Sequence, residues 1–163
     1  MNQIIIREVS LEDLDQLSSI ENQCFPEAEA ASRETLEERL RVFTDCFLGA
    51  EADGRLVGFI NGCSTDSRVI FDELYHNTGL HKPEGETLTV FGLDVVPEYQ
   101  KRGIAAELLW QYIERAKAAG KKRVVLTCKD HLVHYYEKFG FINNGISGST
   151  HGGAVWYDMT LNF

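Results

Sequence analysis

The chain has few of the residues and patterns that mark disulfide-rich, metal-clustered or membrane proteins. It contains only three prolines and four cysteines in 163 residues. The cysteines, at positions 24, 46, 63 and 128, are widely spaced and form no C-x-x-C pair, so we expect free thiols, with Cys63 and Cys128 acting as small buried hydrophobes. No apolar run approaches the roughly 20 residues that a membrane-spanning helix needs. Residues 1–8 show no basic stretch followed by an apolar one, and we therefore expect a cytoplasmic protein without a membrane partner.

Positive charge is also scarce. Lysine and arginine number 16 against 25 aspartates and glutamates, which gives a formal net charge of −9. Nucleic-acid binding needs clustered basic residues, so we expect no nucleic-acid partner. A cationic substrate such as an amine is compatible with this charge. His76, His81 and His151 are dispersed among loops without metal-ligand spacing, and no metal site is predicted.

What is present is the pattern of one α/β domain spanning residues 1–163. Its hydrophobic fraction of 44% suits a soluble globular protein with a single core. In the first half, Asp53-Gly54 between two apolar runs is a strong hairpin signal. Ser10, with Asp13 three residues later, and Ser32 are typical helix caps. The expected elements are a strand near 4–9, helices after Ser10 and Ser32, hairpin strands over 47–52 and 55–60, and a short helix within 69–75.

The second half begins with the nearly continuous apolar run 88–96, which predicts one central strand covered on both faces. A helix should follow from near Gly103 and end at Gly120, and residues 124–126 should form a strand parallel to the first. Asp130 is expected to cap a further helix, stopped by Gly140, and the last strands are expected over 141–142 and 154–161. The predicted order, β-α-α-β-β-(α)-β-α-β-α-β-β, is that of a mixed α/β fold.

The junction between the strand ending at Val96 and the helix after Gly103 has the features of an anion site. The first turn of a helix leaves about four backbone N–H groups without intrahelical partners and carries the positive end of the helix dipole. Gly103 with Ala105 and Ala106 lets an anion approach this backbone, and Lys101 and Arg102 add positive charge. The segment therefore predicts a pyrophosphate-binding helix start, although it matches neither the Walker nor the Rossmann pattern.

Two motifs resemble those of one known family. Gln100-Lys101-Arg102-Gly103-Ile104-Ala105 is similar to the Q/R-x-x-G-x-G/A motif of the GCN5-related N-acetyltransferase (GNAT) superfamily. Residues 136–141, Y-E-K-F-G-F, are similar to its Y-E-K-x-G-F motif. Residues 59–62, 108–110 and 128–136 most resemble arylalkylamine (serotonin-type) N-acetyltransferases. The resemblance implies the acyl-CoA N-acyltransferase fold, a central mixed sheet of about seven strands with four or five helices.

The same resemblance implies a site for acetyl-CoA. The strand matching 88–96 would splay from its parallel neighbour, and the backbone of Leu93, Asp94 and Val95 would pair with the pantetheine arm. Gln100 and the amides of Lys101, Arg102, Gly103, Ile104, Ala105 and Ala106 would hold the pyrophosphate. Tyr136, close to the thioester sulfur, would act as general acid for the leaving thiolate. The amine would attack directly, without a covalent enzyme nucleophile.

The general base is where the chain departs from its apparent relatives. The vertebrate-type arylalkylamine enzymes carry two histidines at the positions of Thr89 and Phe91, and other members carry a glutamate at the first of these. An alkylamine is mostly ammonium near neutral pH, so a proton must be accepted before attack. The remaining candidates are Glu27, Glu29, Glu86 and His134, each of which can equally be a solvated surface residue.

The acceptor site is expected opposite the cofactor arm, from residues 25–32 and 147–153. Phe25, Glu27 and Glu29, with Phe91, offer an apolar surface beside negative charge. We therefore expect acetyl transfer from acetyl-CoA to a primary amine, by a monomer or homodimer. An arylalkylamine or polyamine fits this surface, and a small amine, an amino acid or a protein N-terminus stays open. The alternatives are a non-catalytic acyl-CoA-binding module and a nucleotide-binding domain that uses the same helix start.

Overall fold

The computed structural model describes residues 3–163, and over this range the chain forms nine strands and five α-helices arranged around two sheets. The first sheet is antiparallel and has the order β1-β2-β3-β6. Its strands are β1 (Ile4–Arg7), β2 (Phe47–Ala52), β3 (Arg55–Asn61) and β6 (Gly92–Val95). The second sheet has the order β4-β5-β7-β9-β8. Its strands are β4 (Ser64–Thr65), β5 (Thr87–Val90), β7 (Arg123–Cys128), β9 (Tyr157–Asn162) and β8 (Ile142–Ile146).

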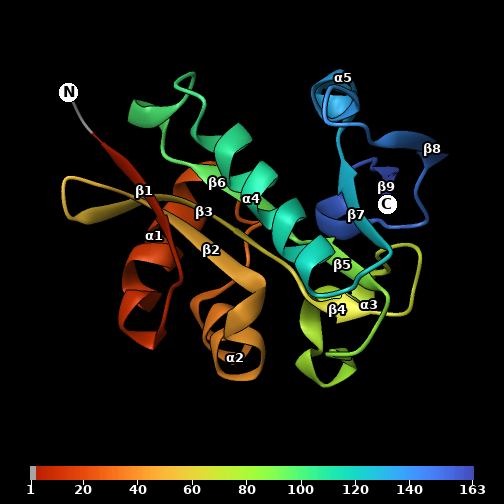
Figure 1. Ribbon diagram of the computed structural model, residues 1–163, viewed down its shortest axis with the longest axis horizontal. Coiled ribbons are helices and arrows are strands. Elements are labelled where there is room, and N and C mark those ends of the chain that lie inside the picture. Colours follow the sequence, from red (N-terminus) through yellow and green to blue (C-terminus); the bar gives the residue numbers. More distant parts are fainter. Residues whose placement is uncertain (1–2) are drawn as a thin grey trace.

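The helices cover the sheets and close the core. They are α1 (Leu14–Cys24), α2 (Arg33–Phe43), α3 (Asp72–His76), α4 (Ile104–Ala118) and α5 (Val133–Glu137). Figure 1 shows α1 and α2 beside the first sheet, α5 beside the second, and α4 running diagonally across both. The buried stripe of α4, which includes Leu108, Leu109, Tyr112 and Ile113, packs against this central region. The long helix therefore ties the two sheets together.

The prediction of one continuous strand over 88–96 is wrong. The segment breaks at Phe91: β5 pairs in parallel with β7 up to Val90, whereas β6 pairs antiparallel with β3 from Gly92. An apolar run indicates that a strand is buried on both faces, but it does not indicate with which neighbouring strand each residue pairs. The break, together with the two-residue β4, explains why the described residues hold nine strands in two sheets rather than one sheet of about seven.

The break depends on close backbone packing at Gly62. The N–H of Thr89 donates to the carbonyl of Cys63 at 2.8 Å, and that of Phe91 donates to the carbonyl of Asn61 at 2.7 Å. A Cβ on Gly62 would lie 1.6 Å from the carbonyl oxygen of Thr89, so only glycine permits this approach. The chain crosses from one sheet to the other within this short segment.

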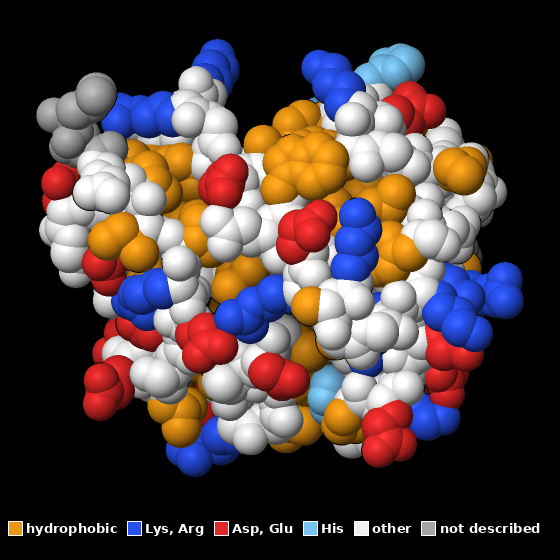
Figure 2. Space-filling model, in the orientation of Figure 1, with side chains coloured by type: hydrophobic (Ala, Val, Ile, Leu, Met, Phe, Trp, Pro, Cys, Tyr) orange, Lys and Arg blue, Asp and Glu red, His pale blue; other side chains and the backbone are white. Residues whose placement is uncertain are grey.

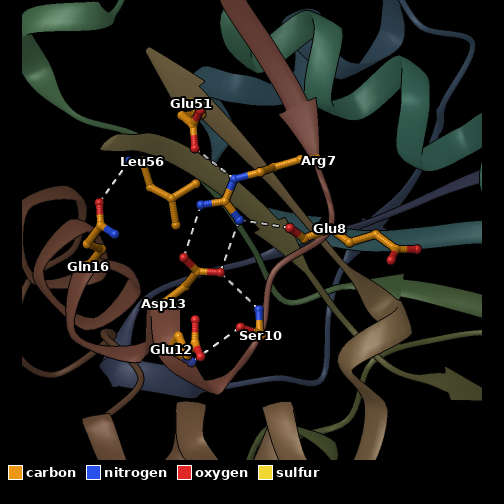
Figure 3. Close-up of polar contacts among 8 residues, drawn as sticks. All are labelled: Arg7, Glu8, Ser10, Glu12, Asp13, Gln16, Glu51 and Leu56. Atoms are coloured by element: carbon orange, nitrogen blue, oxygen red, sulfur yellow. Dashed lines mark hydrogen bonds and ion pairs between the residues drawn. The ribbon is translucent and has the colours of Figure 1, made fainter. Parts of the chain in front are cut away.

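A cluster of polar contacts fixes the start of α1 against the first sheet (Figure 3). The Ser10 hydroxyl and the Asp13 carboxylate form the predicted capping box. Arg7 donates to both oxygens of Asp13, at 3.0 and 3.1 Å, and to Glu51 on β2 at 2.9 Å. The side chain of Gln16 accepts the N–H of Leu56 on β3 at 2.8 Å. These bonds set the position of α1 across the sheet, and with it the residues at its C-terminal end.

Most of the remaining local predictions are confirmed. Ser32 caps α2 through the N–H of Thr35, and the Asp53-Gly54 turn joins β2 to β3 with both residues at positive φ. Gly120 ends α4 at a φ of 78°, and the cysteines are free. The cap at Asp130 is not found, because Lys129 occupies the N-cap position and makes no side-chain cap bond. Within residues 3–163, no helix is long and apolar enough to cross a membrane.

Candidate functional site

Three cavities formed by residues 3–163 lie around the point where β6 parts from β7. The largest, of about 620 Å³, lies between the start of α4, β6 and α5, and we call it the groove. A second, the central cavity of about 230 Å³, lies deeper, between the ends of β5 and β7 and the loop after α1. The side cavity, about 200 Å³, adjoins it beside α2. Figure 2 shows the surface hollowed between the two halves of the molecule, with hydrophobic side chains in the hollow.

The start of α4 forms one wall of the groove and has the geometry of an anion site. The first helical backbone bond runs from the N–H of Glu107 to the carbonyl of Gly103, which leaves the preceding N–H groups without intrahelical acceptors. Gly103 adopts a φ of 84°, and no atom lies within 4 Å of the place where its Cβ would be. Lys101 also has a positive φ, of 63°. The unfilled space over this backbone fits a phosphate group.

The groove contains most of the residues predicted to bind the cofactor. These are Leu93, Val95, Gln100, Lys101, Gly103, Ile104, Ala105, Ala106 and Tyr136. Two predicted residues do not line it. The exposed Arg102 lies with its guanidinium 4.7 Å from the centre of the Tyr99 ring. Asp94 is fully buried and is paired with Phe59 of β3, so the structure does not place it at the groove.

The Gln100 side chain contributes differently from its motif neighbours. Its Nε2 donates to the carbonyl of Val95 at 2.9 Å. That carbonyl lies on the edge of β6 that β3 does not use. The bond holds the loop between β6 and α4 against the strand, so Gln100 shapes the groove as well as lining it.

Tyr136 lies where the groove meets the central cavity. Together with Leu93 and Leu132 it lines both. Only 8% of the residue is exposed. This burial is the main reason why the pKa of its phenol is raised above the ordinary value. The phenol therefore carries its proton near neutral pH and can donate it to a group at this junction.

The predicted acceptor residues divide between the cavity wall and the surface. Phe25, Glu29 and Phe91 line the central cavity, and Glu29 and Phe91 also line the side cavity. Glu27 is exposed and lines none of the three cavities. It lies in the loop after α1, between residues that do line the central cavity.

The candidate bases differ in their ion-pair partners, their exposure and whether they line a cavity. The Glu29 side chain, 9% exposed, forms an ion pair of 2.8 Å with Lys129, so its charge already has a partner. Glu86 pairs with Lys122 at 3.1 Å and lines none of the three cavities. His134 has a side chain 96% exposed and pairs with Glu137. Thr89 is buried, and its Oγ1 accepts the N–H of Cys63 at 2.9 Å.

Several residues of the cavity walls were not predicted from the sequence. They are Glu21, Cys24, Tyr75, Lys129 and Trp156, whereas His151 lines the same cavity from within the predicted segment 147–153. The rings of Tyr75 and His151 stack at 4.6 Å, and His151 Nε2 lies 2.9 Å from the carbonyl oxygen of Glu29. One signal was present in the sequence, because Glu21 follows Leu14 and Leu17 at helical spacing on the buried stripe of α1. A carboxylate at such a position is rarely buried without a reason.

The two cysteines of the central cavity are poor nucleophiles. Both thiols have a raised pKa, about 11 for Cys24 and about 11 for Cys128, and burial is the main reason in each case. The thiolate is the reactive form of cysteine, and it is scarce near neutral pH at such values. No group of three or more His, Cys, Asp or Glu residues within residues 3–163 has the arrangement of a metal site.

Comparison with known proteins gives consistent matches over nearly the whole chain. The acetyltransferase (GNAT) family matches residues 14–141. Serotonin N-acetyltransferase from Mesocricetus auratus is 31% identical over 152 residues, which is 91% of this chain and 72% of that protein. The human serotonin N-acetyltransferase is 28% identical with the same coverage of both chains.

Solved structures show the same arrangement of helices and strands. The loading GNATL domain of CurA from Lyngbya majuscula has a TM-score of 0.84 at 18% identity, covering 99% of this chain and 98% of that one. The PaiA N-acetyltransferase from Thermoplasma acidophilum, solved in complex with coenzyme A, has a TM-score of 0.73 at 22% identity and covers 99% of both chains. At these identities the two structures show a shared fold.

Proposed function

This chain belongs to the acetyltransferase (GNAT) family, and we propose that it transfers the acetyl group of acetyl-CoA directly to a primary amine. The observation that carries the proposal is the position of Tyr136, which lines both the groove and the central cavity. A donor arm in the groove and an acceptor in the central cavity would meet at this side chain. The relatives named serotonin N-acetyltransferase support the same class of reaction.

The groove provides the parts that a nucleotide-linked thioester needs. The free amides at the start of α4, with the space over Gly103, would hold the pyrophosphate, and Lys101 would add charge. The backbone of Leu93 and the N–H of Val95 on the open edge of β6 would pair with the amide groups of the arm, since Gln100 already binds the Val95 carbonyl. Acetyl-CoA would supply the activated acyl group, and this backbone would direct it towards Tyr136.

Tyr136 would supply the proton that the departing thiolate needs. Its buried phenol is protonated near neutral pH, as its raised pKa requires, and it lies at the junction of the two cavities. A proton transfer of this kind contributes about 10²–10⁴-fold to an enzymatic rate. The raised pKa values of Cys24 and Cys128 favour direct attack by the amine over an acetylated cysteine.

We further propose that the acceptor is an arylalkylamine. Phe25, Tyr75, Phe91 and Trp156 give the central cavity aromatic walls, which suit a flat ring. Glu21 and Glu29 provide carboxylates within the same walls, and these suit the cationic amine. A linear polyamine would match the charge but would leave the aromatic walls without a partner.

A panel of amines tests both parts of the proposal. Thiol release from acetyl-CoA would be measured with 2-phenylethylamine, tryptamine, spermidine and an amino acid at about pH 7 to 9, where an increasing share of each amine is free base. We expect turnover with the two arylalkylamines at higher kcat/KM than with spermidine. Acetyl-CoA binding without amine-dependent release would instead identify a non-catalytic acyl-CoA-binding module.

A further inference from the structure

Two carboxyl groups are buried together beside the central cavity. Glu21 on α1 is 6% exposed, and Asp94 on β6 is fully buried. Glu21 Oε2 accepts the N–H of Ala31 at 2.8 Å. Oε1 of Glu21 and both oxygens of Asp94 have no hydrogen-bond donor among residues 3–163. Three buried carboxyl oxygens without donors are costly, so this arrangement calls for a proton or a ligand.

The two carboxyl groups approach each other over Gly92. Measured from the position that a Gly92 Cβ would take, Oδ1 of Asp94 lies at 3.1 Å and Oε1 of Glu21 at 3.7 Å. Since both are acceptors when charged, they can share a hydrogen bond only if one holds a proton. The pKa of Asp94 is raised well above its usual value, first by burial and then by the charge of Glu21. The raised pKa favours Asp94 as the neutral partner, whose O–H would then be directed at the Glu21 carboxylate.

The positive charge nearest this pair belongs to Arg39 on α2, but its guanidinium is held elsewhere. Nη1 donates to Asn61 Oδ1 at 2.9 Å and Nη2 to the carbonyl of Tyr75 at 2.9 Å. Arg39 thus offsets the charge of Glu21 through space without occupying its free oxygen. The other polar or titratable groups around the pair are Cys24, Glu29, Asn61, Cys63, Tyr75 and His151.

Glu21 also has access to the acceptor site, because it lines both the central and the side cavity. Glu29 lines the same two cavities, but its carboxylate is paired with Lys129, whereas Glu86 and His134 line neither cavity. We propose that Glu21 accepts the proton of the incoming ammonium group and that Asp94 is the positioning residue that holds its carboxylate ready. This inference rests on the proposed function, and it fills the role for which Thr89 and Phe91 have no suitable group.

The proton transfers balance over one turnover. The Glu21 carboxylate takes one proton from the ammonium, directly or through one water, and leaves a neutral amine. The amine nitrogen then forms the new N–C bond as the C–S bond breaks, and Tyr136 gives its proton to the thiolate sulfur. The second proton of the acylated nitrogen restores the Tyr136 phenol. Glu21 releases its proton to solvent, so the net products are the amide, the thiol and one proton.

A pair of acceptors that differ in basicity provides the test. 2-Phenylethylamine is an ammonium ion near neutral pH, as lysine-like amines are, and must lose a proton before it can attack. O-Benzylhydroxylamine has the same number of non-hydrogen atoms and the same ring, but its nitrogen is weakly basic and uncharged at pH 7. Only the first acceptor should depend on Glu21 as a base.

Glu21→Gln is the informative variant, since the glutamine oxygen can still accept the N–H of Ala31. We expect kcat/KM for 2-phenylethylamine to fall by about 10²-fold or more. With O-benzylhydroxylamine we expect a loss roughly an order of magnitude smaller, or none. The matched control is Asp15→Asn on the same helix, whose side chain is 85% exposed and should leave both rates unchanged.

Variants of Asp94 test the positioning role. Asn can still donate a hydrogen bond to the Glu21 carboxylate, so Asp94→Asn should keep most of the turnover with 2-phenylethylamine. Asp94→Leu has the same number and branching of side-chain heavy atoms, with methyl groups in place of the oxygens, but has no donor and should lose turnover selectively with this acceptor. Infrared difference spectra of wild type against Asp94→Asn should show the loss of a protonated-carboxyl band at neutral pH, and this readout needs no substrate.

The outcomes separate this inference from the proposed function. If the wild type turns over both acceptors and Glu21→Gln slows them equally, Glu21 has a packing role and the inference is wrong. An infrared spectrum without a protonated Asp94 would overturn the positioning role even if no acceptor were found. If the wild type binds acetyl-CoA but acetylates no amine, the proposed function itself fails.

Discussion

The guanidinium of Arg39 lies 4.5 Å from the centre of the Phe91 ring, at the residue where the two sheets part. The same guanidinium hydrogen-bonds Asn61 on β3 and the carbonyl of Tyr75 on α3. The ring of Tyr75 in turn lies 5.1 Å from that of Phe91. Arg39 therefore joins α2, α3 and the strand break, and it keeps Phe91 at the wall between the central and side cavities.

Removal of this guanidinium should destabilise the fold strongly. Arg39→Met leaves Asn61 and the Tyr75 carbonyl without their donor and Glu21 without a nearby cation, so we expect the free energy of unfolding to fall by about 3 kcal/mol or more. Urea denaturation would measure it. Arg41→Met, on the exposed face of the same helix, should change stability by only about 0.5 kcal/mol. Addition of Glu21→Gln to Arg39→Met should recover part of the loss, and a purely additive double variant would contradict the charge compensation.

Gly103 can be tested against a glycine with the same conformation. Gly103 and Gly54 have φ values of 84° and 81°, and neither has an atom within 4 Å of its missing Cβ. Gly103→Val and Gly54→Val should therefore lose similar stability, about 1–3 kcal/mol each. Only Gly103→Val should also weaken acetyl-CoA binding, by about tenfold or more, or roughly 1.4 kcal/mol. Equal acetyl-CoA affinities in the two variants, measured by calorimetry, would place the pyrophosphate elsewhere.

Tyr136→Phe should lower kcat far more than it weakens binding. The variant keeps the buried ring and its edge contacts with Tyr135 and Phe141 but removes the proton donor. We expect kcat to fall by about 10²-fold with the Kd for acetyl-CoA nearly unchanged, as for a group that acts in the transition state. Tyr135→Phe is the neighbouring control and should stay close to wild type. A parallel loss of kcat and affinity in Tyr136→Phe would point to a packing role.

Protonation of Asp13 should contribute to the loss of folding stability in acid. The pKa of this carboxyl lies below its ordinary value, mainly because the carboxylate accepts hydrogen bonds from Arg7. Its stabilisation is therefore present above about pH 4 and is lost as the pH falls through the lower folded-state pKa. Asp13→Asn should cost about 1 kcal/mol at neutral pH. The difference in the free energy of unfolding between Asp13→Asn and the wild type should become smaller in acid. Unfolding curves at several pH values would measure it. The exposed Glu114→Gln should show no such convergence.

The sequence predicted the local structure well wherever a residue acts through its own backbone or its immediate neighbours. Ser10, Ser32 and Gly103 each mark a helix start because caps and left-handed conformations are determined locally. The clustering of Gln100, Gly103 and Ala105 along the groove could be predicted for the same reason, since these residues belong to one short continuous segment.

The acceptor side could not be predicted to the same degree because it depends on contacts between distant segments. Glu21 and Asp94 are 73 positions apart, and only the fold brings their carboxyl groups over Gly92. Glu27 and Glu29 could not be told apart in the sequence, yet Lys129, a hundred residues away, pairs with one and not the other. Asp94 shows the limit of prediction from sequence most clearly. The family resemblance implies a role for its backbone, whereas its side chain lies beside that of Glu21.

The parting of β6 from β7 also bears on how this protein avoids aggregation. Unpaired strand edges normally recruit strands from other molecules, and proteins shield them with charge, proline or covering helices. Here the edge of β6 that β3 does not use has no strand partner among residues 3–163, and neither do Thr127 and Cys128 of β7 on the side of β5, while α4 packs against both strands. The fold can thus keep an open sheet edge without exposing it to self-association.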